Sequence, residues 1–169
     1  MLTPARWLTD HRSLLPAQGD ALDVACGRGR NALWLAAEGF IVRGVDRDAA
    51  AVEALNTEAA RAHFPVTGDV VDLESGDPGL GVSAFDLVVV TNYLHRPLFP
   101  YLLAALRPGG TLVYETFTRA QARRGKPTNP AFLLERDELR QLVAPLVILT
   151  AREGEAEGRD VASVIARKT

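Results

Sequence analysis

Two kinds of apolar pattern alternate along the chain. Short runs rich in valine, leucine and isoleucine are typical of buried strands. They cover residues 21–26, 40–46, 64–69, 84–90 and 111–116. Stretches whose apolar positions recur every three or four residues lie between the runs and predict helices. These cover residues 32–38, 48–61 and 98–106. The alternation predicts an α/β fold in which a mostly parallel sheet is doubly wound, with helices on both faces.

The two ends of the chain add further elements to this core. Residues 4–15 predict a short helix before the first strand, and residues 135–143 predict another helix. Two more apolar runs, 146–151 and 161–166, are joined by a charged, glycine-containing stretch. They predict an antiparallel hairpin at the sheet edge, which makes seven strands in all.

Two segments lack a clear periodic pattern. Residues 73–83 are rich in glycine and proline and predict a loop. Residues 117–130 form a polar, basic stretch that is longer than a typical connection, so we expect either a functional lid or a loosely ordered segment. Its charges could bind an anionic substrate, although a solvated face is the commoner role of such a run.

Composition narrows the class of protein. The 169 residues suit a single domain covering residues 1–169. The formal net charge of -2 gives no global attraction to nucleic acid or to an anionic membrane, so a small molecule is the expected partner. One cysteine excludes an internal disulfide, and no apolar run approaches the roughly 18 residues of a membrane span. With no signal-peptide pattern at its start, the chain is expected to be cytoplasmic, in an oligomeric state that the sequence does not indicate.

A glycine-rich turn carries the first sign of chemistry. The strand at 21–26 ends in Gly27 and Gly29 and passes directly into a helix. Glycines allow a ligand to approach the backbone closely, and the N–H groups that open a helix favour an anionic group. Asp23 lies inside the strand, where burial requires a polar partner such as the amides of the turn. The pattern Gly27-x-Gly29-x-x-Ala32 also satisfies the relaxed dinucleotide fingerprint, so NAD remains open as a ligand.

The turn resembles motif I of the class I methyltransferases that depend on S-adenosylmethionine (SAM). The resemblance rests on residues 23–29, Asp-Val-Ala-Cys-Gly-Arg-Gly, and on the acidic strand ends Asp46 and Asp69. Ala25 stands where that family usually has glycine. Residues 29–31 (Gly-Arg-Asn) and 115–117 (Glu-Thr-Phe) are similar to the tellurite-resistance-type methyltransferase group, a likeness that covers nearly the whole chain. It implies a Rossmann-like fold with a C-terminal antiparallel hairpin.

The resemblance also implies a site for SAM. Gly27 and Gly29 would accommodate its methionyl part, and Asp46 would accept hydrogen bonds from the ribose hydroxyls. Asp69 would accept from the adenine amino group, with Val70 or Val71 packing on the ring. The expected cofactor residues are Asp23, Cys26, Gly27, Gly29, Arg30, Asp46, Arg47, Asp69, Val70 and Thr91.

Several of these residues also have a purely structural interpretation. Asp46 and Asp69 could simply cap the segments that follow them. Arg30 could pair with the SAM carboxylate or be a solvated cation on the first helical turn. Cys26 suits packing better than nucleophilic chemistry.

Candidate catalytic residues follow the fourth and fifth strands. Tyr93, His95 and Arg96 come after the fourth strand, where this fold places groups that face the methyl acceptor. His95 could act as a base, or it could only hydrogen-bond, because a soft thiolate or chalcogenide needs no base. Glu115 ends the fifth strand and either faces the acceptor or pairs with an arginine of residues 117–130. No His/Cys cluster has metal-ligand spacing, so no metal is predicted.

The sequence therefore predicts a SAM-dependent methyltransferase that acts on a small molecule, with a thiol or a chalcogen oxyanion as candidate acceptors. Alternatives are an NAD-dependent oxidoreductase, a nucleic-acid or protein methyltransferase, and a non-catalytic SAM-binding module. Residues 91–94 lack the Asn/Asp-Pro-Pro-aromatic segment of amino-methylating DNA enzymes, and 169 residues leave little room for a dehydrogenase's substrate domain.

Overall fold

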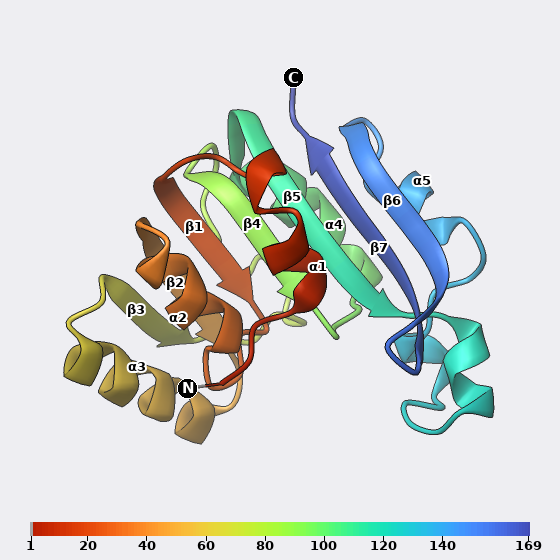
Figure 1. Cartoon of the computed structure of the whole chain (residues 1–169), viewed down its shortest axis with the longest axis horizontal. Helices are drawn as coiled ribbons and strands as arrows, with labels where there is room; N and C mark the ends of the chain where they lie inside the picture. The colour runs from red at the N-terminus through yellow and green to blue at the C-terminus, as the bar shows by residue number, and fades with distance from the viewer. Residues whose placement is uncertain (1) are drawn as a thin grey trace.

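A single seven-stranded sheet forms the centre of the protein (Figure 1). A computed structural model describes residues 2–169. The strand order is β3-β2-β1-β4-β5-β7-β6, in which β7 runs antiparallel to both of its neighbours and the other pairs are parallel. The strands are β1 (Gly19–Val24), β2 (Phe40–Asp46), β3 (Val66–Val70), β4 (Phe85–Thr91), β5 (Leu106–Phe117), β6 (Val147–Ala156) and β7 (Arg159–Arg167). The predicted fold class is confirmed.

Helices cover both faces of the sheet. They are α1 (Arg6–Asp10), α2 (Arg30–Ala37), α3 (Ala49–Ala62), α4 (Phe99–Ala105) and α5 (Glu138–Leu142), with short 3-10 turns η1 (Arg12–Leu14), η2 (Arg96–Leu98), η3 (Arg119–Arg123) and η4 (Pro130–Phe132). The residues of α1, α2 and α3 share one buried core with the sheet, and those of α4 and α5 share the other. Figure 1 shows α1 and α2 in front of the sheet and α4 behind it.

Alternate residues along the central strands serve the two cores. In β4, Leu87 and Val89 belong to the core under α2, whereas Val88 and Val90 belong to the core under α4. All four side chains are fully buried. A continuous apolar run is what a strand covered on both faces requires, which is why the sequence predicts this strand clearly.

The C-terminal hairpin is longer than its sequence predicts. β6 and β7 pair as far as Ala156 and Arg159, so the charged stretch taken for a loop is mostly strand. The turn residues Glu157 and Gly158 have φ of 55° and 76°, the pair of positive values that a type I′ hairpin needs. A glycine after an acidic residue was the available signal for this turn.

Residues 117–130 pack against the hairpin. Thr118 bridges to Leu134, and Arg119 Nη2 lies 2.6 Å from Glu135 Oε1, so the start of the segment lies beside residues 134 and 135, shortly after its end. Arg124 pairs with Asp160 of β7. These contacts argue against a loosely ordered chain, and a role as a lid stays a prediction. Within residues 2–169 no helix is both long enough and apolar enough to span a membrane.

Candidate functional site

The turn between β1 and α2 adopts a left-handed backbone. Ala25, Gly27 and Gly29 have φ of 54°, 54° and 89°. A Cβ on Gly29 would lie 2.2 Å from Leu55 Cδ1 of α3, so only glycine allows this approach. A Cβ on Gly27 would meet nothing within 4 Å, because that side of the turn faces open space. Gly29 thus allows the turn to pack against α3, and Gly27 leaves room beside the turn.

Asp23 holds the turn against the helix that follows it. Its side chain is only 1% exposed, and Oδ2 accepts a hydrogen bond of 3.0 Å from the backbone N–H of Ala32 in the first turn of α2. Burial raises the pKa of this carboxyl to about 7, and the Ala32 hydrogen bond and the nearby Arg30 only partly oppose that effect. Asp23 thus has a backbone amide as its polar partner, and it joins the end of β1 to the start of α2.

Asp46 connects the end of β2 to the same turn. Oδ2 accepts from the backbone N–H of Gly27 at 2.8 Å, and Oδ1 accepts from the backbone N–H of Asp48 at 2.9 Å. The cap of α3 is Asp48, which accepts from Ala50 and Ala51. Because each carboxylate oxygen has two lone pairs, Asp46 keeps acceptor capacity toward the cavity that it lines.

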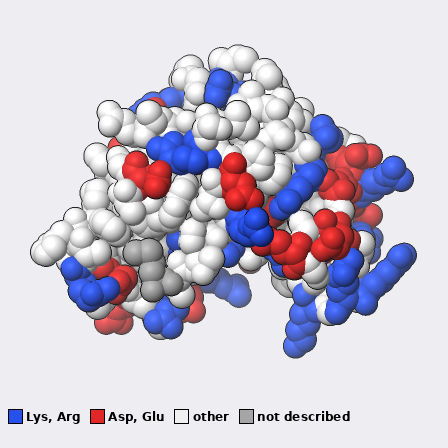
Figure 2. Space-filling model, viewed as in Figure 1, with Lys and Arg blue, Asp and Glu red and all other residues white. Residues whose placement is uncertain are grey.

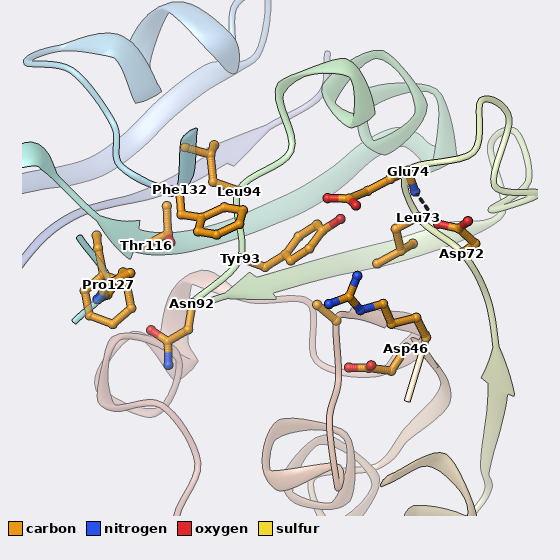
Figure 3. Close-up of a pocket in the computed structure, with 13 residues that line it drawn as sticks. Asp46, Asp72, Leu73, Glu74, Asn92, Tyr93, Leu94, Thr116, Pro127 and Phe132 are labelled. Carbon is orange, nitrogen blue, oxygen red and sulfur yellow. Dashed lines mark hydrogen bonds between the residues drawn. The ribbon is translucent and has the colours of Figure 1, made fainter. Parts of the chain in front are cut away.

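That cavity has a volume of about 370 Å³ and opens at the carboxyl ends of β1, β2, β4 and β5 (Figure 3). Its walls are formed by Ala25, Asp46, Arg47, Asp72, Leu73, Glu74, Asn92, Tyr93, Leu94, Thr116, Phe117, Pro127 and Phe132. In Figure 3, Asp46, Asp72 and Glu74 lie at one end and Asn92, Thr116, Pro127 and Phe132 at the other, with Tyr93 between them. The carboxyl ends of parallel strands are where this sheet topology binds ligands.

Of the ten predicted cofactor residues, Asp46 and Arg47 belong to the cavity wall, whereas Asp69 and Val70 lie elsewhere on the sheet. Asp69 is not in that wall, and its Oδ2 lies 2.8 Å from Arg43 Nε in a half-exposed ion pair. Val70 is largely exposed at the edge strand. Both border a separate shallow hollow against α3. The structure instead brings Asp72, which the sequence did not single out, to the cavity.

Arg30 and Thr91 lie behind the turn and brace it. Thr91 Oγ1 accepts from Asn31 Nδ2 at 3.0 Å and from Arg30 Nη2 at 3.3 Å. Asn31 in turn accepts from the backbone N–H of Ala5, so the N-terminal segment is tied to α2. The Cys26 thiol is buried, and burial raises its pKa well above the ordinary value, which suits packing and not nucleophilic attack.

Among the predicted catalytic residues, Tyr93 lines the cavity, whereas the others, His95, Arg96 and Glu115, do not. Burial, together with the nearby Glu74, raises the pKa of Tyr93 to about 12, so its hydroxyl stays protonated. His95 lies outside the cavity wall, with Nδ1 3.7 Å from Glu74 Oε1. Arg96 donates to both carboxylate oxygens of Glu138, at 2.7 and 2.8 Å, and this ion pair joins η2 to α5.

Glu115 is buried inside an arginine cluster. It is 2% exposed, and its oxygens accept from Arg152 and Arg159, each at 3.1 Å, and from Ser163 Oγ at 2.5 Å. Its neighbours Thr116 and Phe117 line the cavity, whereas Glu115 does not. Glu115 therefore pairs with arginines, which was one of its two expected roles. These arginines come from β6 and β7 and not from residues 117–130.

Several cavity residues were missed by sequence reasoning, among them the polar Asp72, Glu74 and Asn92. Asp72 and Glu74 follow β3, and Asn92 follows β4 with φ of 57° and its N–H bonded to Glu115 O. A non-glycine residue in the left-handed region at a strand end is a recurrent sign of a functional position. The available signal was their place just after two strands of the parallel part of the sheet.

Comparison with known proteins identifies the family. The model of the methyltransferase domain family matches residues 21–110, more than half of the chain. Hemagglutinin 1 of Eikenella corrodens is 31% identical over 153 residues, which cover 83% of this chain and 50% of that protein. The chain thus spans about half the length of this curated relative.

Solved structures share the fold. TehB from Haemophilus influenzae superposes with a TM-score of 0.79 at 18% identity, over 96% of this chain and 61% of that one. Geranyl diphosphate C-methyltransferase from Streptomyces coelicolor A3(2), in complex with Mg2+, geranyl diphosphate and S-adenosyl-L-homocysteine, gives 0.76 at 18% identity, over 97% and 79%. The family match confirms the predicted methyltransferase family, for which SAM is the predicted cofactor. This chain belongs to the methyltransferase domain family.

Proposed function

We propose that this chain binds SAM in the cavity and transfers its methyl group to a small-molecule acceptor, either a thiol or a chalcogen oxyanion. The observation that carries the proposal is Asp46. Its carboxylate is fixed by the N–H groups of Gly27 and Asp48 and still faces the cavity, ready to accept from a pair of neighbouring hydroxyls such as those of a ribose.

The rest of the cavity fits the same cofactor. The open space beside Gly27 leaves room for a ligand close to the backbone. Asp46, Asp72 and Glu74 outnumber Arg47 in the wall, so this end favours a cation, and a sulfonium is a cation. Bound SAM supplies an electrophilic methyl group. The protein's own contribution is to orient the acceptor in line with that methyl and to exclude water from it.

A small acceptor agrees with the charge distribution. Figure 2 shows Lys and Arg side chains mixed with Asp and Glu side chains over the visible face, with several arginines in ion pairs. Such a surface does not present the broad basic field that attracts nucleic acid. We therefore favour a small molecule over a nucleic-acid substrate.

Calorimetric titration with SAM, S-adenosylhomocysteine (SAH) and NAD tests the proposal. We expect SAH to bind and NAD to bind at least ~10-fold more weakly. Asp46→Ala removes two charge-assisted hydrogen bonds to the ribose and should weaken SAH by roughly 10- to 100-fold. Asp46→Asn keeps an acceptor for Gly27 and controls for loss of the turn. Glu53→Ala, an exposed carboxylate on α3 outside the cavity, is the matched control.

Either of two results would contradict the proposal. Binding of NAD without SAH would favour the oxidoreductase alternative. SAH affinity that is the same in wild type and in a folded Asp46→Ala variant would remove Asp46 from the site.

A further inference from the structure

The end of the cavity away from Asp46 has a distinct chemistry. We call it the acceptor end; it is lined by Asn92, Leu94, Thr116, Phe117, Pro127 and Phe132. None of these six residues is ionisable, whereas the charged residues of the cavity wall gather at the other end (Figure 3). The acceptor end therefore suits an uncharged, apolar body, because a full charge there would lose its hydration without gaining an ionic partner.

The acceptor end opens into an adjoining hollow of about 500 Å³. Phe117, Pro127 and Phe132 line that hollow, and its other lining residues are Asn92, Lys126, Thr128 and Asn129. Phe132 is 48% exposed, although a large aromatic side chain is usually buried. An exposed aromatic residue at a cavity mouth gives an apolar ligand a surface to pack on.

A general base is missing from the acceptor end within residues 2–169. Tyr93, at its border, has its pKa raised to about 12 and keeps its proton. His95 lies outside the cavity wall and faces Glu74. Glu115 is held by two arginines and does not line the cavity. The carboxylates of the cavity, Asp46, Asp72 and Glu74, lie at its other end (Figure 3). An acceptor bound at the acceptor end therefore loses its own proton to solvent at neutral pH.

The need to lose a proton to solvent distinguishes thiols from phenols and amines as acceptors. A thiol ionises near pH ~8.5, whereas a phenol needs pH ~10 and an alkyl amine ~10.4. Near neutral pH a thiol thus supplies a far larger fraction of the reactive form. Selenite and tellurite also ionise, but they carry no apolar body on which the apolar side chains of the acceptor end could pack.

We infer that the acceptor is a thiol carried on an apolar, uncharged body and methylated as its thiolate, an inference that rests on the proposed function. The thiol proton leaves to solvent, and a sulfur lone pair then forms the new S–CH₃ bond. The methyl–sulfonium bond of SAM breaks, its electron pair stays on that sulfur, and SAH and a neutral thioether result. Opposite charges are neutralised, a change that an apolar, water-poor site favours.

Asn92 is placed to assist this step by hydrogen bonding. Its Oδ1 accepts a long hydrogen bond of 3.4 Å from Arg159 Nη1. With the carbonyl oxygen oriented toward Arg159, the amide N–H₂ remains as a donor for a thiolate. A neutral hydrogen-bond donor stabilises the thiolate less strongly than an ion pair with a fixed cation would, so the sulfur stays nucleophilic.

An acceptor series tests the inference with purified protein and SAM. It comprises thiophenol, phenol as its oxygen counterpart, 2-mercaptoethanol as a thiol without an apolar body, selenite and tellurite. We expect kcat/KM for thiophenol to exceed that of every other compound by ~10-fold or more. The pH of half-maximal rate should follow the pKa of each thiol. Phenol methylated as fast as thiophenol, preference for an oxyanion, or one protein pKa common to all thiols would overturn the inference.

Phe132→Ala gives a readout that does not depend on turnover. Titration of thiophenol into the SAH-loaded protein should show a Kd raised by about 10-fold, from the lost apolar contact, with SAH affinity unchanged. Val82→Ala is the control, because Val82 is 79% exposed and lies outside the cavity wall. Equal thiophenol affinity in both variants would refute the assigned acceptor end.

The two proposals fail in different ways. Absence of SAH binding would refute the proposed function itself. SAH binding that depends on Asp46, combined with methylation of an amine or an oxyanion but of no thiol, would leave the proposed function standing and refute only the acceptor class.

Discussion

Replacing Asp23 by asparagine should make the protein more stable at alkaline pH and remove the contribution of this carboxyl to the pH dependence of the free energy of unfolding. Asp23 is fully buried beneath the glycine turn, and burial raises its pKa from 3.8 to about 7. The native state therefore holds the proton more tightly than the unfolded chain does. Below pH ~4 both states are protonated and the carboxyl costs nothing; the cost grows as pH rises toward 7 and is constant above it.

The shift sets the magnitude of this effect. Three pKa units at 1.36 kcal/mol each correspond to a cost of about 4 kcal/mol above pH 7. Over the convenient range from pH 5 to pH 8, the change in this contribution is about 3 kcal/mol. Asparagine fits the same space, and its Oδ1 can still accept from the N–H of Ala32.

Urea unfolding at pH 5, 6, 7 and 8 measures the effect. The free energy of unfolding of Asp23→Asn, minus that of wild type, should rise by about 3 kcal/mol from pH 5 to pH 8. The charged neighbours Arg30 and Asp46 are present in both proteins, so the difference isolates position 23. A difference that does not change with pH would show that the carboxyl is not shifted as its burial requires.

Two further predictions concern the turn and the arginine cluster. Gly29→Ala places a Cβ 2.2 Å from Leu55 Cδ1 and should lower the free energy of unfolding by about 3 kcal/mol. Gly27→Ala places a Cβ with nothing within 4 Å and should lower it by about 1 kcal/mol. Equal losses of the two variants in urea unfolding would contradict the packing argument. Glu115→Gln leaves its two partly exposed arginines without their buried carboxylate and should cost about 2 kcal/mol in thermal unfolding while SAH affinity is unchanged. Lost methyl transfer with unchanged stability would instead make Glu115 an acceptor-side residue.

Most of the fold was predictable because local pattern and tertiary role agree in the core. The apolar run of β4 and the helix α3 appear where the sequence predicts them. The hairpin is different, because its charged residues look like a loop until their partner is known. Arg152 and Arg159 are strand residues that neutralise the buried Glu115, and that partner lies far away in the sequence.

The candidate site was predictable in its glycine turn and less so around it. Asp46 lies where a strand end beside the turn places it, and it lines the cavity. Asp69 has the same kind of position in the sequence, yet Arg43 from the neighbouring strand pairs with it. Nothing local distinguishes the two aspartates, because the difference is made by a side chain 26 positions away. Tyr93 and Asn92 likewise reach the cavity through the course of the chain after β4, which sequence pattern does not specify.

A crystal structure of the complex with SAH tests the central claim most directly. We predict that the ribose hydroxyls lie within hydrogen-bond distance of the Asp46 carboxylate and that the sulfur faces the acceptor end, toward Asn92 and Phe132. A nucleoside bound instead in the shallow hollow at Asp69 and Val70, or a sulfur directed away from the acceptor end, would contradict the account.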